Sequence, residues 1–149
     1  MTGRAGHACR TNLETAICRE MDRQEVPHEH RSLRFRVSDA RGGSTKYEPA
    51  IVAHRGPILF LVEPIGTARS AAVRRLTGFL RQHSPEIVLV LVTTDAALTE
   101  IAPEAYDEIY GASDVGRLTA RIRGQDPEGI VQPFEKPQRR VKRSRDTAK

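Results

Sequence analysis

The fold is decided by residues 46–66, whose sequence is KYEPAIVAHRGPILFLVEPIG. An apolar segment follows Pro49, a Gly-Pro pair reverses the chain, and a second apolar segment ends at the acid Glu63. Gly-Pro pairs mark turns between periodic segments. Because the run Ile58–Val62 is apolar at every position, it is typical of a strand that is covered on both faces. The stretch therefore predicts a β-hairpin near the centre of a sheet.

The residues after this hairpin predict a parallel pair of strands. Thr67 can cap a helix that runs to about His83, and Ser84-Pro85 ends it. Glu86–Thr93 is again apolar on both faces, which predicts another buried strand. A helix between two such strands indicates a right-handed βαβ unit.

The N-terminal part predicts a helix and a further strand. A helix is expected over about Leu13–Gln24, with Thr11 or Asn12 as its cap. In Arg31–Val37 apolar and basic residues alternate, which predicts a strand with one buried and one exposed face. A cluster of turn residues follows, and we expect this strand to form a hairpin with a strand over Lys46–Ala53.

The C-terminal part predicts helical segments. Asp95–Ile101 and Pro103–Ile109 look like short helices, and Ser113 or Asp114 can cap a helix that ends near Arg123. The resulting order of elements is α-β-β-β-α-β-α. It predicts an α/β fold, a three-layer α/β/α sandwich with a mixed central sheet.

Charge is concentrated at the C-terminal end of the chain. Residues 133–149 carry seven basic residues against two acidic ones, which accounts for the whole net charge of +5. We therefore expect a disordered lead-in at 1–10, one domain at 11–125 and an irregular basic tail at 126–149. The run Arg139–Arg143 in that tail is typical of segments that bind nucleic acid.

The composition, with 38% hydrophobic and 29% charged residues, indicates a soluble globular protein. The longest apolar run, Ile58–Val62, is far shorter than the ~20 residues that span a bilayer. The first ten residues lack the apolar core of a secretory signal. We therefore expect a cytoplasmic protein that does not contact a membrane.

The cysteines and histidines do not predict a metal site. Cys9 and Cys18 lie nine residues apart, which matches no recognised zinc or redox spacing, and we expect a reduced structural pair. His28 and His30 share one face of an extended segment and could chelate a metal ion in principle. Since no third ligand follows at a recognisable spacing, no site is assigned to them.

The spacing of four positions resembles the active-site pattern of the PD-(D/E)xK nuclease superfamily, the restriction-endonuclease-like fold with its αβββαβ core. Glu14 and Glu63 carry two of the family's four functional groups, and the other two positions hold Ala50, after a proline, and Ile65. Glu20 fits the helix position less well than Glu14, because it lies on the apolar stripe of the helix. The resemblance covers Leu13–Thr93, and the chain is similar in this respect to archaeal Holliday-junction resolvases and transposon-end nucleases. It implies a metal site made by a helix Glu, the Asp of a Pro-Asp pair, and the acid and Lys of a triplet. This chain has Ala50 and Ile65 in place of that Asp and Lys, which implies impaired cleavage.

Glu48 could replace the missing carboxylate. It shares a strand face with Ala50, ~6–7 Å along the strand. With Glu14 and Glu63 as metal ligands, Glu48 could complete a displaced catalytic site for Mg²⁺ or Mn²⁺, because both ions prefer carboxylate oxygens. The alternative is that Glu48 is a solvated strand residue and that Glu63 is satisfied by an amide or an arginine.

A second set of candidates is basic and would bind nucleic acid through its phosphates. The set comprises Arg34, Arg36, Arg69, Arg74, Arg75, Arg139, Arg140, Lys142 and Arg143. The alternative for the arginines of the domain is a solvated face balanced by the acidic residues of 100–114, and for the tail a solubilising segment.

Three functions remain open on the sequence. The first is a nuclease-fold domain with impaired catalysis that binds nucleic acid, expected to be DNA. The second is an active Mg²⁺- or Mn²⁺-dependent DNA endonuclease, a hydrolase of phosphodiester bonds. The third is a structural subunit whose acidic surface around Glu104–Glu108 docks a basic protein partner. A homodimer is compatible with each of them.

Overall fold

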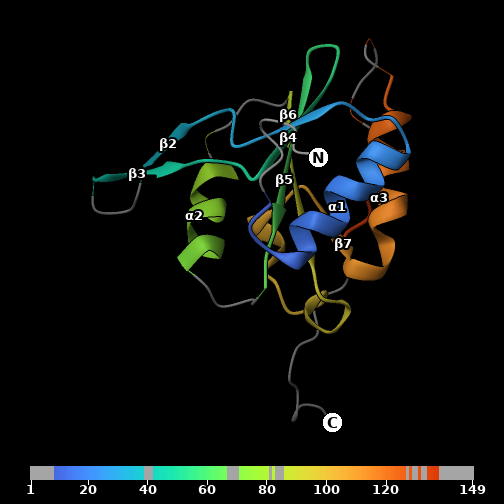
Figure 1. Ribbon diagram of the computed structural model, residues 1–149. Coiled ribbons are helices and arrows are strands. Elements are labelled where there is room, and N and C mark those ends of the chain that lie inside the picture. The colour runs from blue at the N-terminus through green and yellow to red at the C-terminus, as the bar shows by residue number, and fades with distance from the viewer. Residues whose placement is uncertain are drawn as a thin grey trace, which may run out of the picture.

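A five-stranded mixed sheet forms the centre of the protein (Figure 1). A computed structural model describes residues 9–38, 42–66, 71–80, 82, 86–126, 128, 131 and 134–137, with the side chains of 71–74 excepted. The strand order is β1-β4-β5-β6-β7. The strands are β1 (His28–His30), β4 (Ile51–Arg55), β5 (Ile58–Pro64), β6 (Ile87–Thr93) and β7 (Glu108–Gly111). β1, β4 and β5 pair antiparallel, whereas β5, β6 and β7 pair parallel. The protein is therefore an α/β protein, and the mixed sheet predicted from the sequence is confirmed.

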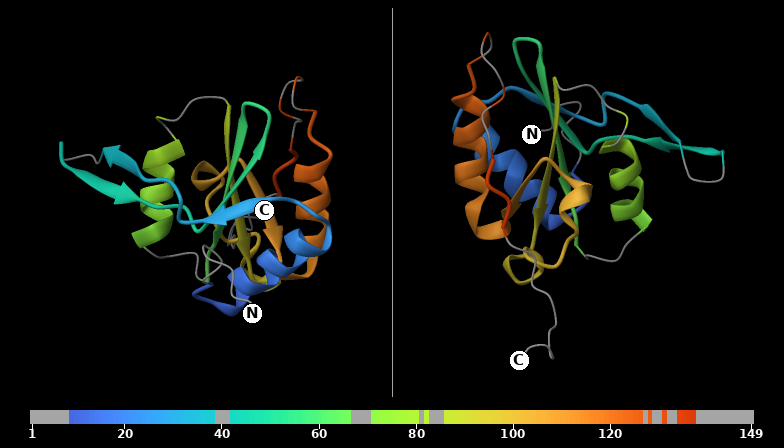
Figure 2. Two further views of the ribbon diagram at one scale, coloured as in Figure 1. Left: turned by 45° about the horizontal axis from the view of Figure 1, so that its top comes forward. Right: turned by 180° about the vertical axis from the view of Figure 1, so that it is seen from behind.

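Helices lie on both faces of this sheet (Figure 2). α1 (Asn12–Arg23) and α3 (Val115–Arg123) lie side by side on one face, and α2 (Ala71–Leu80) lies on the other. The Thr11 hydroxyl accepts a hydrogen bond from the amide of Glu14 at 3.0 Å, which caps α1 as the sequence predicts. The helices expected before residue 24, within 67–83 and before residue 123 are all present, and the parallel pairing of β5 with β6 confirms the βαβ unit.

Two apolar cores separate these elements because the central strands are buried on both faces. One core joins α1 and α3 to the sheet and contains Ile17, Phe60, Val90 and Leu118. The other lies between the sheet and α2 and is built on alternate residues of the same strands, such as Leu61 and Leu89. The fully apolar run at the centre of the opening stretch is thus explained by burial on two sides.

The hairpin after β1 departs from the sequence prediction. β2 (Phe35–Ser38) and β3 (Ser44–Tyr47) form a separate two-stranded sheet that projects over α2. The strand predicted over Arg31–Val37 therefore begins later, and the strand predicted over Lys46–Ala53 is two strands, β3 and β4. Pro49 lies between β3 and β4, and a residue without an amide hydrogen interrupts a strand ladder at this kind of position.

β7 is the second departure. Pro103–Ile109 was predicted to be helical, but only Pro103–Ala105 forms a turn of 3-10 helix, and the chain then enters the sheet. The sequence pattern does not predict this strand, because it contains the acid Glu108. In the structure Glu108 is buried in β7 and pairs with Arg121 of α3. Asp107 also accepts a hydrogen bond from the amide of Leu89. The acidic surface expected around Glu104–Glu108 is therefore largely absent.

The ends of the chain are described only in part. The lead-in at 1–8, the expected cap Thr67 and most of the tail lie outside the described residues. Of the range expected to be an irregular tail, Phe134 packs against Tyr110 with ring centroids 5.5 Å apart, and the Lys136 ammonium donates to the carbonyl of Pro103 at 2.8 Å. In the part of the chain that the structure describes, every helix is too short or too polar to cross a bilayer.

Phe79 of α2 should hold the β2–β3 hairpin on the domain. Its ring contacts the rings of Phe35 and Tyr47 at centroid distances of 5.0 and 5.1 Å, and it is buried. We expect Phe79→Ala to lower the free energy of unfolding by about 3–5 kcal/mol, measured by urea denaturation. Arg36→Ala on the exposed side of β2 is the control and should change it by less than ~0.5 kcal/mol. Equal effects of the two substitutions would contradict this packing.

Candidate functional site

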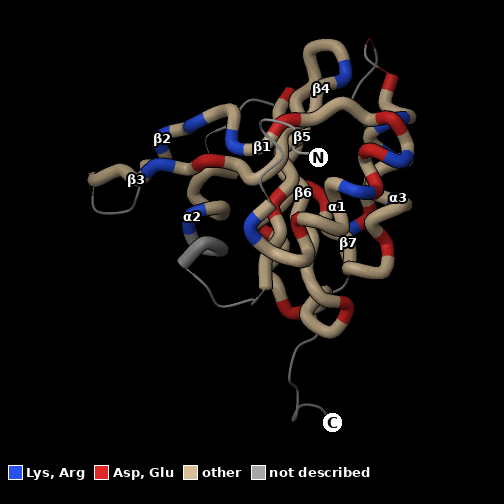
Figure 3. Tube along the Cα trace, in the orientation of Figure 1, with Lys and Arg blue, Asp and Glu red and all other residues tan. Residues whose placement is uncertain are grey.

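A polar pocket of about 490 Å³ is lined by residues from the β2–β3 hairpin, the ends of β4 and β5, α2 and the segment before α1. Its lining residues are Arg10, Arg31, Arg34, Lys46, Tyr47, Glu48, Ala50, Glu63 and Arg75. Figure 3 shows that Lys and Arg positions gather along β2, β3 and α2 on this side of the sheet. Of the four positions that the nuclease resemblance singles out, the pocket lining therefore contains Ala50 and Glu63, among more basic side chains than acidic ones.

Glu63 lies near the end of β5 and is largely buried. Its Oε1 accepts two hydrogen bonds at 3.1 Å, one from the Tyr47 hydroxyl and one from the amide of Ala50. Burial raises the pKa of Glu63 to about 7, against the opposing effect of these two hydrogen bonds and of the nearby Arg31. The carboxyl group is therefore close to half protonated at neutral pH.

Glu14 is fully buried and is bound on both of its oxygens. Arg31 donates to Oε1 at 2.7 Å and to Oε2 at 2.9 Å, His30 Nδ1 donates to Oε2 at 2.7 Å, and the amide of Arg10 donates to Oε1 at 3.1 Å. Burial alone would raise the pKa of Glu14, but hydrogen bonds from Arg31, the Arg10 amide and His30 outweigh it and lower the pKa. Glu14 is thus a carboxylate whose charge is already compensated by the protein.

The backbone at Arg31 positions this ion pair. Arg31 follows β1 with φ of 52°, a left-handed conformation that costs a non-glycine residue roughly 1–2 kcal/mol. Its amide donates to the carbonyl of Ala50 at 3.1 Å, which fixes the turn against β4. Strained backbone of this kind concentrates at functional sites. The turn lets the guanidinium reach Glu14 while it also lines the pocket.

Ala50 and Ile65 occupy the positions where the family pattern has Asp and Lys. Both are buried, with 3% and 4% of their surface exposed. Ala50 offers Glu63 a backbone amide, and Ile65 packs into the core that contains α2 while its amide donates to Val92. Neither position can provide a metal ligand or a charged side chain to the pocket.

Glu48 shares the pocket with Glu63, whereas Glu14 lies outside the lining. The side chain of Glu48 is about one-third exposed and pairs with Arg34, whose Nε lies 3.3 Å from its carboxylate. The structure therefore brings two of the three carboxylates expected at the displaced catalytic site to one pocket. Arg31 binds the third.

The basic candidates divide into three groups. Arg34 and Arg75 line the pocket, and the Nε of Arg75 is buried and has no hydrogen-bond partner among the described residues. Arg36 is exposed on β2 and donates to Ser44 at 3.2 Å. Arg69 and the tail residues Arg139, Arg140, Lys142 and Arg143 lie outside the described residues, as does the side chain of Arg74.

Sequence reasoning missed Arg10 and Lys46 as pocket residues and did not pair Arg31 with Glu14. Lys46 is the first residue of the stretch 46–66, and Arg10 directly precedes Thr11, the cap of α1. Their closeness in sequence to the motif residues could have identified both as pocket residues. The five cationic side chains exceed the two acids of the lining, Glu48 and Glu63. Guanidinium groups bind phosphate and carboxylate through paired N–H donors, so the arrangement is suited to an anion.

The raised pKa of Glu63 makes stability depend on pH. The folded pKa of about 7 lies above the usual carboxyl value, so ionisation of Glu63 destabilises the fold increasingly as pH rises from about 4.5 to above 7. We expect Glu63→Gln, which keeps an acceptor oxygen, to be more stable than the natural chain at pH 8, by as much as about 3 kcal/mol. The difference should fall to below about 1 kcal/mol at pH 5.

Urea denaturation at pH 5 and pH 8 measures this difference. Glu48→Gln is the matched control, because Glu48 is partly exposed and lies in the same pocket. It should change stability little at either pH. If Glu63→Gln were equally stabilising at both pH values, the ionisation of Glu63 would not be the cause.

Comparisons of the chain with protein-family models, with curated proteins and with solved structures return no match. The resemblance to the PD-(D/E)xK nucleases therefore remains a prediction carried by the residues of the motif.

Proposed function

We propose that this protein is a nuclease-fold domain that binds the phosphate backbone of DNA and has lost the metal site needed to cleave it. One observation carries the proposal: Arg31 binds both oxygens of Glu14, so the carboxylate that the family uses for a metal ion instead holds a cation of the protein. The pocket beside it is lined by more cationic than acidic side chains, as a site that binds phosphate requires.

The arrangement of elements supports the fold assignment. α1 carries Glu14, the β4–β5 hairpin carries Ala50 and Glu63, and α2 leads into the parallel strand β6. Helices on both faces of the mixed sheet agree with a three-layer α/β/α sandwich of the restriction-endonuclease-like type (Figure 2). In such an arrangement the motif residues meet at one end of the central hairpin, which is where the pocket lies.

The electrostatics of the pocket argue against ordinary nuclease chemistry. A divalent cation needs carboxylate oxygens that are ionised and not already bound by stronger donors. Both oxygens of Glu14 accept charged or polar donors, and Glu63 favours its protonated form up to about pH 7. Five cationic side chains line or adjoin the same space and would repel a metal ion. Mg²⁺ or Mn²⁺ would have to displace Arg31 to use Glu14.

The same features favour a phosphodiester. Arg34 directly precedes β2, Lys46 lies on β3 and Arg75 on α2, so three separate segments bring cations to the pocket. The buried Nε of Arg75 has no hydrogen-bond partner among the described residues, and a phosphate oxygen would satisfy it. The basic tail can add phosphate contacts that depend on salt but not on sequence.

Substitution of pocket cations should weaken DNA binding. We expect Lys46→Gln and Arg75→Gln each to lower the affinity of the full-length chain for duplex DNA several-fold and to reduce the slope of log K against log salt by about 1. Fluorescence anisotropy at two or more salt concentrations measures both quantities. Arg123→Gln is the control, because Arg123 is exposed on α3 and does not line the pocket.

Two results would contradict the proposal. Binding that is unaffected by the pocket substitutions but lost on changing Arg139, Arg140, Lys142 and Arg143 to Gln would assign binding to the tail alone. Cleavage of DNA in Mg²⁺ or Mn²⁺ that is abolished by Glu63→Ala would show that the carboxylate site is active. Under the proposal, no cleavage that depends on Glu63 is expected.

DNA affinity should also depend on the protonation of Glu63. Below about pH 7 the carboxyl group is mostly neutral, and above this pH its negative charge repels a phosphate. We therefore expect tighter binding at pH 6 than at pH 8, by several-fold, and a smaller difference for Glu63→Gln. The same anisotropy titration measures it at constant ionic strength. Glu48→Gln, as control, should retain the pH dependence of the natural chain.

A further inference from the structure

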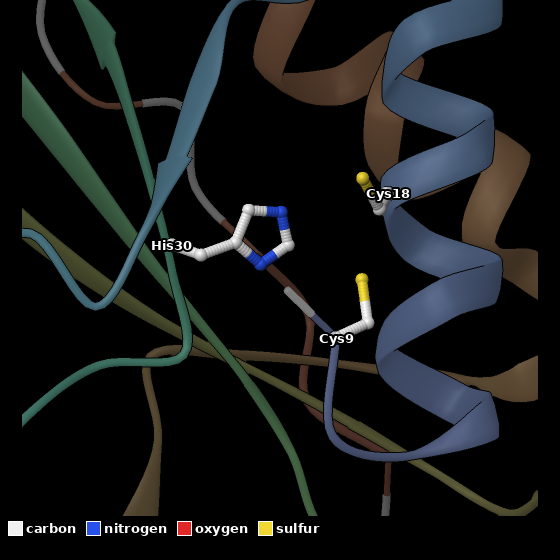
Figure 4. A group of neighbouring side chains, drawn as sticks. All are labelled: Cys9, Cys18 and His30. Carbon is white, nitrogen blue, oxygen red and sulfur yellow. The ribbon is translucent and has the colours of Figure 1, made fainter. Parts of the chain in front are cut away.

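Two cysteines and one histidine from three segments of the chain meet beside Glu14, outside the pocket, and a second histidine reaches one of the cysteines. The ligand atoms of Cys9, Cys18 and His30 all lie within 4.8 Å of one another. Cys9 precedes α1, Cys18 lies on α1, and His30 lies on β1 (Figure 4). His28, two residues before His30 on the same strand, places its Nε2 3.2 Å from the Cys18 sulfur.

Hydrogen bonds fix the orientation of both imidazole rings. His30 Nδ1 lies 2.7 Å from the carboxylate of Glu14, which also accepts hydrogen bonds from Arg31 on both oxygens, so this nitrogen carries the hydrogen and donates. His28 Nδ1 lies 3.0 Å from the carbonyl of Val26, which can only accept. In each neutral ring the lone pair is therefore on Nε2. Histidines that bind metals usually donate their other ring hydrogen to a carboxylate or a carbonyl in this way.

We propose that Cys9, Cys18, His28 and His30 form a structural Zn²⁺ site. Two thiolates and two imidazoles are a common ligand set for structural zinc, with Zn–S distances of about 2.3 Å and Zn–N distances of about 2.0–2.1 Å. Tetrahedral geometry with those lengths places a sulfur and a nitrogen ligand about 3.6 Å apart. The separation of 3.2 Å between Cys18 and His28 is within a few tenths of an ångström of that value.

The position of the four residues explains what the metal ion would do. α1 packs against the sheet through its apolar face, but β1 is an edge strand of only three residues, paired on one side with β4. A zinc ion would connect the segment before α1, the second turn of α1 and β1. It would also hold His30 on Glu14, and thereby set the place of Arg31 at the edge of the pocket.

Metal content and ligand type can be measured on the full-length chain. Protein purified under reducing conditions from zinc-supplemented cultures should contain about one zinc ion per chain by elemental analysis. Co²⁺ titrated into the reduced, metal-free chain should give visible d–d bands of tetrahedral intensity and a thiolate-to-cobalt charge-transfer band. These spectra report thiolate ligation in the natural chain, so they do not depend on whether any variant folds.

Single substitutions then identify the ligands. Cys9→Ser, His28→Gln and His30→Gln should each reduce zinc retained after dialysis against a chelator at least ten-fold, with circular dichroism as the check of folding. His54→Gln, at an exposed histidine of β4, is the matched control and should retain zinc.

Three results would overturn the site. The first is natural chain that holds no zinc and gives no charge-transfer band with Co²⁺. The second is zinc retained in full by the folded His30→Gln variant or lost from His54→Gln. The third is folded protein, isolated without chelator, that holds a Cys9–Cys18 disulfide in place of zinc, detected as a mass decrease of two hydrogens.

Discussion

The rest of the structure depends on the carboxylate of Glu14, which is buried without any exposed surface and receives donors from Arg31, His30 and the amide of Arg10. An isolated carboxylate in such a place would be strongly destabilising, so its partners must stay in position. This requirement fixes where α1 lies against β1, and it draws Arg31 into a left-handed turn at the edge of the sheet. A single buried charge thus organises the edge strand, the first helix and one wall of the pocket.

A buried ion pair of this type is weak evidence for added stability, because desolvation of both charges offsets much of their attraction. The ion pair instead determines how the elements that carry it are arranged. Removal of one partner leaves a buried, uncompensated charge, so the pair defines one arrangement of α1 and β1 and disfavours others. Arg31 then serves two regions at once, because the same guanidinium neutralises Glu14 and lines the pocket. Under the proposed function, the position of a family metal ligand would thus have become part of a framework for binding anions.

The sequence predicts the parts of this protein whose side chains follow a simple period. The strands Ile58–Pro64 and Ile87–Thr93, the capped helix that begins at Asn12, and the mixed sheet all follow from apolar patterning. β7 was missed because Glu108 is an acid in a buried strand, and its partner Arg121 lies in a helix that only folding brings near. The contacts of the candidate functional site also depend on residues that are distant in the sequence and that only folding brings together. Glu63 was expected beside Glu14, but no periodicity could show that Arg31 binds both oxygens of Glu14, or that Cys9 and His30 converge.

Two metal chemistries have been considered for Glu14, one under each proposal, and they make different demands on its oxygens. As a direct ligand of Mg²⁺ or Mn²⁺ it would need an unshared oxygen facing the pocket, whereas as the acceptor of His30 Nδ1 it orients an imidazole toward two sulfurs. The second role uses Oε2 and is strengthened by Arg31, because the guanidinium keeps the carboxylate ionised and so keeps the hydrogen on Nδ1. Under the proposed function, Ala50 and Ile65 in place of Asp and Lys would remove the hard-metal site. The conformation of Arg31 would then leave Glu14 as the outer partner of the proposed zinc site, through the oxygen that His30 contacts.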